Sequence, residues 1–169
     1  MSKEKLVIVN SLSPGDILVM SCAIRSLHLA YPDRYEVDVR SPCNEIFMNS
    51  PYIKPMRISN QAEENRIIEV LKSDPDHAPI EAEGIKFVFS HYPEIHRSGM
   101  SGLHFSDGHR LFLERQLQVP IPQTGMRPDI FLSETELRID NPMKKYYPDY
   151  GKYWVLNAGV KTDYTLKQY

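Results

Sequence analysis

The chain has 169 residues and a mass of 19.6 kDa, which fits one ordinary domain with a buried core. Hydrophobic residues make up 41% and charged residues 25% of the chain, a balance that excludes a mainly disordered or fibrous protein. The 20 basic and 22 acidic residues give a formal net charge of -2. Because a general nucleic-acid binder is usually basic, we expect no nucleic-acid partner.

The sequence shows no targeting or membrane-spanning signal. No apolar run approaches the roughly 18 residues of a membrane span, and no small-residue cleavage site follows the polar start. Cys22 and Cys43 lack the spacing of a metal site and do not make a disulfide framework. We therefore expect a cytoplasmic protein.

The first forty residues predict a strand, a helix and a second strand. Residues 5–10 form a short apolar run, which is typical of a strand buried on both faces of a parallel sheet. Residues 35–40 alternate apolar and polar side chains, as in a strand near a sheet edge. Between them, apolar side chains recur at helical spacing at Ile17, Met20, Ile24, Leu27 and Tyr31.

The same alternation continues less clearly along the chain. The pattern predicts short helices over 43–48 and from Ser133, short strands over 54–58 and 129–132, longer helices over 62–71 and 105–117, and a strand over 85–89. The core candidates of the helix over 105–117 are Phe105, Leu111, Phe112, Leu113 and Leu117. Alternating strands and helices predict an α/β fold, a Rossmann-like parallel sheet with helices on both faces.

The end of the chain has the pattern of a second domain that is only begun. Residues 141–152 contain prolines, a glycine and charged residues, which indicate a linker. An apolar strand over 153–157 and a small-residue loop follow, but no helix comes after them. We therefore predict one domain over 1–140, a linker over 141–152 and the start of a truncated second domain over 153–169.

The loop after the first strand is the first candidate site. In open parallel sheets, ligands bind at the carboxyl ends of the strands. Gly15 lets a ligand approach the backbone, and Asp16, ionised at a helix start, has the chemistry of a general base. The alternative is a capping box in which Ser13 is the N-cap, Pro14 the first helical residue and Asp16 the acidic partner. Both interpretations stay open from the residues alone.

The segment over 7–18, with its Gly15-Asp16 pair, resembles the opening of family 9 glycosyltransferases, the bacterial lipopolysaccharide heptosyltransferases and their relatives. The helix end at Ala30-Tyr31-Pro32 is similar, and so are the segments over 35–40 and 49–53. Residues 153–159 look like the first strand and loop of the family's second domain. The ordered combination carries the resemblance, since no single motif is diagnostic.

The resemblance implies the N-terminal, acceptor-side half of a GT-B enzyme. Asp16 would be the catalytic base, in an inverting transfer that requires no metal or other cofactor. The substrates would be a nucleotide diphosphate sugar as donor and a glycan or glycolipid hydroxyl as acceptor, with Ser13 and Gly15 on the acceptor side. The donor phosphate would be bound by Gly159, Lys161, Thr162 and Lys167.

The resemblance also implies limits on activity and location. A family member needs a whole second domain of about 150 residues by ordinary domain size. We therefore expect these 169 residues alone to be inactive. A glycolipid acceptor would bring a cytoplasmic enzyme into peripheral contact with the inner face of the membrane.

A histidine-rich segment follows the predicted strand over 85–89. His91, His96, His104 and His109 fall within 19 residues, and Arg97 lies among them. One interpretation is an acceptor site in which His91, His96 and Arg97 bind a sugar hydroxyl or a phosphate. The other is a solvated polar loop with local hydrogen bonds, in which His104 caps the next helix. The spacing does not match a paired zinc-ligand motif.

Two further functions compete with the transferase. The first is a non-catalytic Rossmann-like module that binds a sugar or nucleotide and needs a partner. The second is a nicotinamide-dependent enzyme, which the absence of Gly-x-Gly-x-x-Gly after the first strand disfavours.

Overall fold

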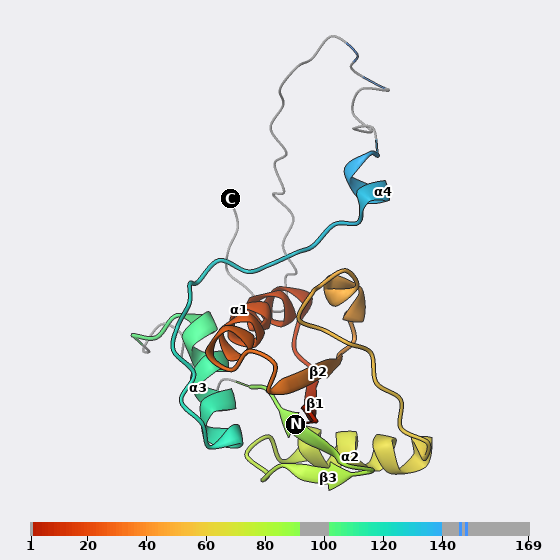
Figure 1. The fold of residues 1–169 in the computed structure, drawn as a ribbon, viewed down its shortest axis with the longest axis vertical. Coiled ribbons are helices and arrows are strands. Elements are labelled where there is room, and N and C mark those ends of the chain that lie inside the picture. The colour runs from red at the N-terminus through yellow and green to blue at the C-terminus, as the bar shows by residue number, and fades with distance from the viewer. Residues whose placement is uncertain (1, 92–101, 140–145, 147, 149–169) are drawn as a thin grey trace, which may run out of the picture. The chain divides into compact units, whose positions relative to one another are not determined.

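The computed structural model describes residues 2–91, 102–139, 146 and 148. Its centre is a four-stranded sheet in the order β2-β1-β4-β3 (Figure 1). β1 pairs in parallel with β2 and with β4, and β3 pairs antiparallel with β4. The strands are β1 (Glu4–Val9), β2 (Tyr35–Arg40), β3 (Ile80–Ala82) and β4 (Ile85–Phe89). The predicted α/β class and the edge position of the strand over 35–40 are confirmed, but the sheet is mixed instead of wholly parallel, because the hairpin makes β3 antiparallel to β4.

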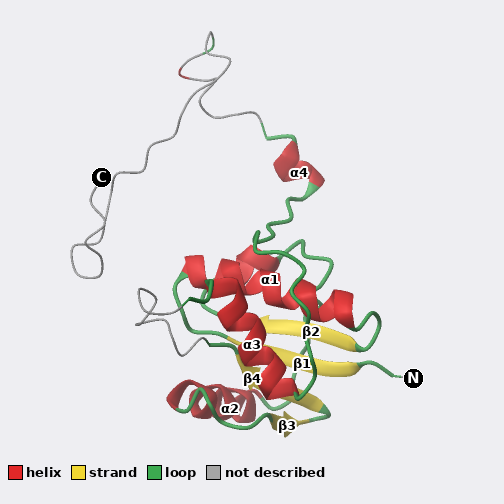
Figure 2. Cartoon of the chain, turned by 90° about the vertical axis from the view of Figure 1, so that its left-hand side faces the viewer, coloured by secondary structure: helices red, strands yellow, loops and turns green. Residues whose placement is uncertain are grey.

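Helices cover both faces of the sheet (Figure 2). α1 (Pro14–Ala30) and α3 (Phe105–Leu117) pack against each other on one face, where Leu6 and Ile8 of β1 point. α2 (Gln61–Ser73) covers the other face, where Val7 and Val9 point. These four side chains of β1 are buried, because successive residues of a strand point to opposite faces and both faces are covered. A short 3-10 helix, η1 (Asn44–Phe47), replaces the helix predicted over 43–48.

Two predicted strands do not form, because side chains take the backbone bonds that a strand would use. Within 54–58, the Lys54 amide donates to the Val37 carbonyl, but the Met56 amide donates to the Asp38 carboxylate at 2.7 Å. Within 129–132, the Asp129 amide donates to Ser21 Oγ at 2.8 Å, and the Phe131 carbonyl accepts from the Asn49 side chain.

The hairpin that joins β3 to β4 was not predicted. β3 has three residues, too few to show a clear alternation. Glu83 and Gly84 connect the two strands, and both have positive φ, 50° and 71°. Two consecutive positive φ angles match the two-residue turn that suits strand twist, and glycine adopts such an angle without strain. The Glu83-Gly84 pair is therefore the feature of the sequence that indicates this hairpin.

The buried face of α3 differs from the predicted one. The side chains of Phe105 and Leu111 are 39% and 38% exposed, so these two core assignments are wrong. The face that packs inward combines Phe112, Leu113 and Leu117 with the polar side chains of Ser106, His109 and Gln116. Phe105 and Leu111 were predicted to be buried because they are hydrophobic. The helical repeat instead places polar residues on the same face as Phe112, Leu113 and Leu117.

The chain divides into two compact units, residues Met1–Leu132 and Ser133–Tyr169. The second unit contains α4 (Glu134–Leu137), which begins with a complete capping box. The Ser133 hydroxyl accepts the Glu136 amide, and the Glu136 carboxylate accepts the Ser133 amide. The predicted helix from Ser133 is thus confirmed. Except for residues 146 and 148, the predicted linker over 141–152 and the segment over 153–169 lie outside the described residues.

Arg25 of α1 fixes the segment over 124–129. Its guanidinium donates to the carbonyls of Gly125 and Arg127, each at 3.0 Å, and forms an ion pair with Asp129. Both charged side chains are largely buried, with 14% and 23% exposed. The segment is therefore attached to α1 by several bonds that share one guanidinium.

Replacing Arg25 with Met should lower the free energy of unfolding by about 2 kcal/mol, because Asp129 and two carbonyls lose their donor while the apolar stem is kept. Urea unfolding followed by circular dichroism measures the change. The matched control is Lys72→Met, which removes the exposed Lys72–Glu69 pair and should cost about 0.5 kcal/mol or less. Equal losses in both variants would contradict the role assigned to Arg25.

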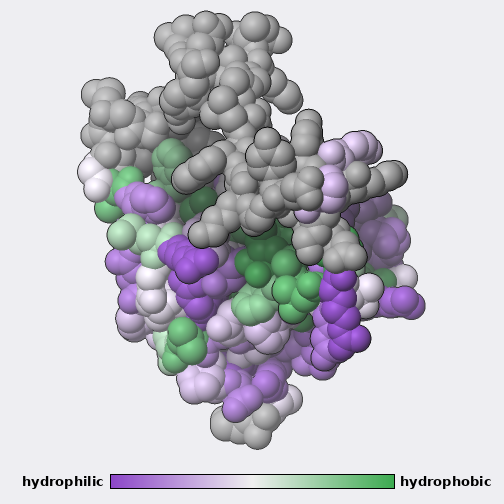
Figure 3. All heavy atoms as spheres, turned by 90° about the horizontal axis from the view of Figure 1, so that it is seen from above, coloured by the Kyte–Doolittle hydropathy of each residue, from purple (hydrophilic) through white to green (hydrophobic). Residues whose placement is uncertain are grey.

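The surface mixes polar and apolar side chains. On the face that Figure 3 presents, strongly hydrophilic residues border a hydrophobic patch. None of the helices within the described residues combines the length and the apolar character needed to cross a membrane.

Candidate functional site

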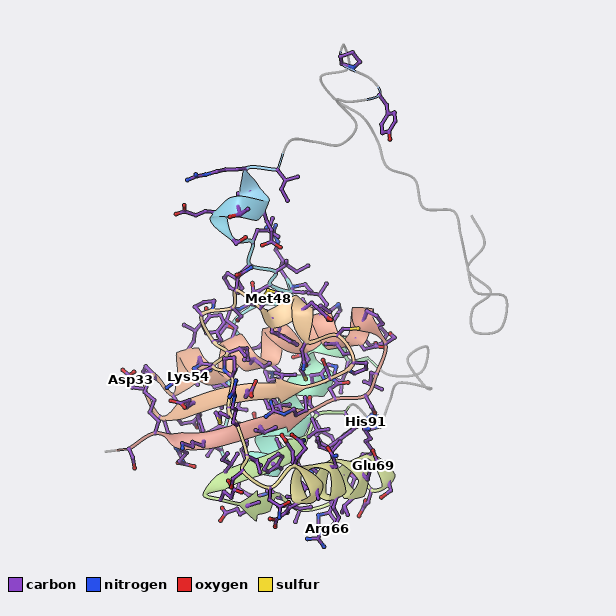
Figure 4. All side chains as sticks on the ribbon, turned by 90° about the vertical axis from the view of Figure 1, so that its right-hand side faces the viewer. Asp33, Met48, Lys54, Arg66, Glu69 and His91 are labelled. Atoms are coloured by element: carbon purple, nitrogen blue, oxygen red, sulfur yellow. The ribbon has the colours of Figure 1, made fainter. Side chains whose placement is uncertain are left out.

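The carboxyl ends of the three parallel strands meet at one edge of the sheet, where ligands bind in open α/β sheets. β1, β2 and β4 end there at Val9, Arg40 and Phe89. Figure 4 shows His91 at this edge and Asp33 at the opposite one. The segments that follow these strands therefore define the candidate site.

The loop after β1 is held by Asn10, which is 1% exposed. Its Oδ1 accepts the Leu12 amide at 2.8 Å, and its Nδ2 donates to Met20 Sδ at 3.3 Å. A buried amide with both polar groups bonded fixes the path of the backbone around it. Asn10 thereby sets where α1 begins relative to β1. From sequence it is only the last residue of a predicted strand, so this role was missed.

Ser13 and Asp16 form a contact different from the predicted capping box. Ser13 is the N-cap of α1 and Pro14 its first residue, as predicted, but the Ser13 side chain makes no capping hydrogen bond. Its hydroxyl donates instead to Asp16 Oδ2 at 2.6 Å. The capping-box interpretation of this loop is therefore wrong. A Ser-x-x-acid spacing forms a full capping box at Ser133, so spacing alone did not separate the two outcomes.

Gly15 lies between these two residues on the exposed start of α1. A Cβ built on Gly15 would meet no atom within 4 Å. The backbone beside Asp16 is therefore open to an approaching ligand.

A fully buried histidine bonds the segment that follows β4. His109 of α3 has no exposed surface, and its Nδ1 hydrogen-bonds Ser90 Oγ at 2.9 Å. Ser90 follows β4 directly, is also fully buried, and donates its amide to the Val9 carbonyl at 2.8 Å. The ends of β1 and β4 thus meet α3 at this site.

Burial lowers the pKa of His109 to about 4. Desolvation disfavours the charged imidazolium, and His91 opposes it further. The Asp16 carboxylate and backbone favour the charged form, but their effect is smaller than that of burial. The His109 ring is therefore neutral at neutral pH, although it interacts electrostatically with Asp16.

His91, predicted as an acceptor contact, is partly buried at the carboxyl edge of the sheet. Its ring lies 6.1 Å from that of Phe89 and 6.1 Å from that of Phe112, measured between centroids. His104 is the N-cap of α3, and its side chain accepts the Ser106 amide, as the capping interpretation predicted. His109, by contrast, lies inside the predicted helix over 105–117 and is buried there.

The grouping of Ser90, His109 and Asp16 has the residue types of a nucleophilic triad. A nucleophile must meet its substrate, however, and Ser90 and His109 are both 0% exposed. This burial excludes Ser90 as the attacking group. Asp16, which is only partly buried, is the member of the group that a substrate can reach.

A cavity of about 460 Å³ lies beside the end of β2. Its wall includes Arg40, which bonds the Asp38 and Glu64 carboxylates and the Met56 carbonyl. Asp38 and Glu64 are 5% and 4% exposed, so this ion-pair network belongs to the interior. It holds together β2, α2 and the segment after η1, and no pattern in the sequence predicted it.

Several predicted site residues lie outside the described residues. They are His96 and Arg97 of the histidine-rich segment, and Gly159, Lys161, Thr162 and Lys167 of the predicted donor-phosphate loop. Within the part of the chain that the structure describes, no group of three or more His, Cys, Asp and Glu side chains is arranged to hold a metal ion.

Comparison of the chain with protein-family models, with curated proteins and with solved structures finds no match. The functional argument therefore depends on the geometry at the carboxyl edge of the sheet.

Proposed function

We propose that the chain is the acceptor-side domain of an inverting GT-B glycosyltransferase similar to the family 9 enzymes, with Asp16 as its general base. One observation carries the proposal. Asp16 lies in the first turn of α1, at the carboxyl ends of three parallel strands, and its carboxylate accepts a hydrogen bond from the Ser13 hydroxyl.

The chemistry follows from this placement. The Asp16 carboxylate accepts the proton of the acceptor hydroxyl as that oxygen attacks the anomeric carbon of the donor. The bond from this carbon to the diphosphate breaks, and the nucleoside diphosphate leaves with the electron pair. A single displacement inverts the configuration at the anomeric carbon. The Ser13 hydroxyl orients the carboxylate, and the open space beside Gly15 admits the acceptor.

The donor in this proposal is a nucleotide diphosphate sugar, held mainly by a second domain that faces this one. The acceptor is a glycan or glycolipid hydroxyl, and a glycolipid acceptor would bring the enzyme to the inner face of a membrane. Stabilising the leaving diphosphate is a large part of the transition-state energy, so we expect transfer to require both domains.

The test is a transfer assay on the full-length protein. UDP-, GDP- and ADP-linked hexoses and heptoses are each incubated with deacylated glycolipid oligosaccharides. Mass spectrometry should find acceptors heavier by one sugar, and proton NMR should find the new linkage inverted relative to the donor. Retained configuration would overturn the inverting mechanism. Donor binding without transfer would overturn the proposed enzymatic activity and favour the non-catalytic binding module.

A further inference from the structure

His109 is a polar side chain placed where α3 would ordinarily bury an apolar one. It lies on the inward face of α3 with Phe112 and Leu113, and it has no exposed surface. A buried polar ring requires hydrogen-bond partners to offset its desolvation. Ser90 Oγ meets this need at Nδ1, at 2.9 Å. The ring is thereby fixed to the residue that follows β4.

The same ring interacts with the start of α1. The titratable groups that act on it from the neighbouring elements are the Asp16 carboxylate on α1 and His91 after β4. α1 and α3 pack together on the same face of the sheet. His109 bonds Ser90, which follows β4, and interacts electrostatically with Asp16, the residue proposed as base.

The neutral state of the ring has a consequence for this base. A cation beside a carboxylate stabilises its ionised form and makes it a weaker proton acceptor. A neutral imidazole provides hydrogen-bonding groups and a fixed shape without that penalty. Burial thus gives Asp16 a polar neighbour that carries no positive charge.

We propose that His109 is a positioning residue for Asp16, anchored through Nδ1 to Ser90, which fixes the orientation of the first turn of α1. The role of Asp16 as base rests on the proposed function. The physical coupling between His109 and Asp16 does not, so the two are tested separately.

The coupling is tested by NMR on the chain with ¹⁵N-labelled histidine at neutral pH. Asp16→Asn should shift the ring nitrogen signals of His109, and so should Ser90→Ala. His28 lies in the last turn of α1 and stacks on Tyr52. Its signals should stay unchanged and serve as an internal control. Glu69→Gln removes an exposed carboxylate on α2 and should move neither histidine. Unchanged His109 signals in Asp16→Asn would overturn the coupling, whatever the protein catalyses.

The positioning role is tested by a double-mutant cycle in the transfer assay. His109→Gln should lower kcat by about tenfold or more at nearly constant donor KM, because a misplaced base costs rate and not donor binding. In the Asp16→Asn background, His109→Gln should have little further effect, because the group it positions is absent.

Outcomes of the cycle separate positioning from general stability. An equal loss of rate in both backgrounds would overturn the proposal, because it would assign His109 a purely structural role. Ser90→Ala provides a second variant with a smaller change in volume, should His109→Gln fail to fold. It should also lower kcat in the presence of Asp16 and not in its absence. His28→Gln should leave kcat unchanged.

Discussion

Asp16→Asn in the full-length protein should lower the transfer rate by about a thousandfold, the middle of the range for removal of a general base. The amide cannot take a proton from the acceptor hydroxyl. Its carbonyl oxygen can still accept the Ser13 hydroxyl, so the first turn of α1 should keep its conformation. Initial rates of nucleoside diphosphate release, together with donor KM, measure the effect.

The control is Asp33→Asn, the same chemical change at the opposite edge of the sheet. Asp33 is 90% exposed, pairs with Lys3 and has φ of 65°, a conformation that asparagine tolerates. Its rate should match that of the wild type. Both variants should also have the same thermal unfolding midpoint as the wild type. A transfer rate in Asp16→Asn within about twofold of the wild type would exclude Asp16 as the base, since general-base catalysis is worth far more.

Local patterning predicted the elements that carry the site. The apolar run over 5–10 ends one residue beyond β1, and the helical spacing from Ile17 to Tyr31 ends at the C-cap of α1. Both elements bury a face whose period appears in the sequence. β4 and α3 were predicted with the bounds that they have in the structure, Ile85–Phe89 and Phe105–Leu117. The parallel pairing of β1 with β2 follows from the intervening helix.

Contacts between distant segments could not be predicted in this way. Ser90 and His109 are polar, and hydropathy assigns polar residues to the surface. Only their neighbours in space show that they are buried. His109 does fall four residues before Leu113, on the face that packs inward. The helical spacing therefore indicated that His109 is buried, although its polarity suggested the surface. The Ser13–Asp16 contact depended on side-chain geometry, which the Ser-x-x-acid spacing does not determine.

The buried His109 should make the protein less stable in mild acid. The folded protein binds a proton at this ring only near pH 4, whereas the unfolded chain binds it near the usual pKa of 6.5. Between these values the unfolded state holds the extra proton, so acid favours unfolding. The free energy of unfolding contributed by the neutral ring is fully present above pH 6.5 and falls by about 3 kcal/mol as the pH approaches 4. Urea unfolding at a series of pH values measures this slope.

His109→Gln removes the titrating group and should flatten the slope over this range, whatever its stability at neutral pH. Burial also lowers the pKa of His28, so a smaller slope of the same sign should remain. The matched control is His77→Gln, at a half-buried histidine that hydrogen-bonds the Ala78 carbonyl, and it should leave the part of the slope that His109 causes in place. An undiminished slope in His109→Gln would mean that other groups cause the acid sensitivity. The neutral state of His109, on which its role beside Asp16 depends, would then lose its thermodynamic support.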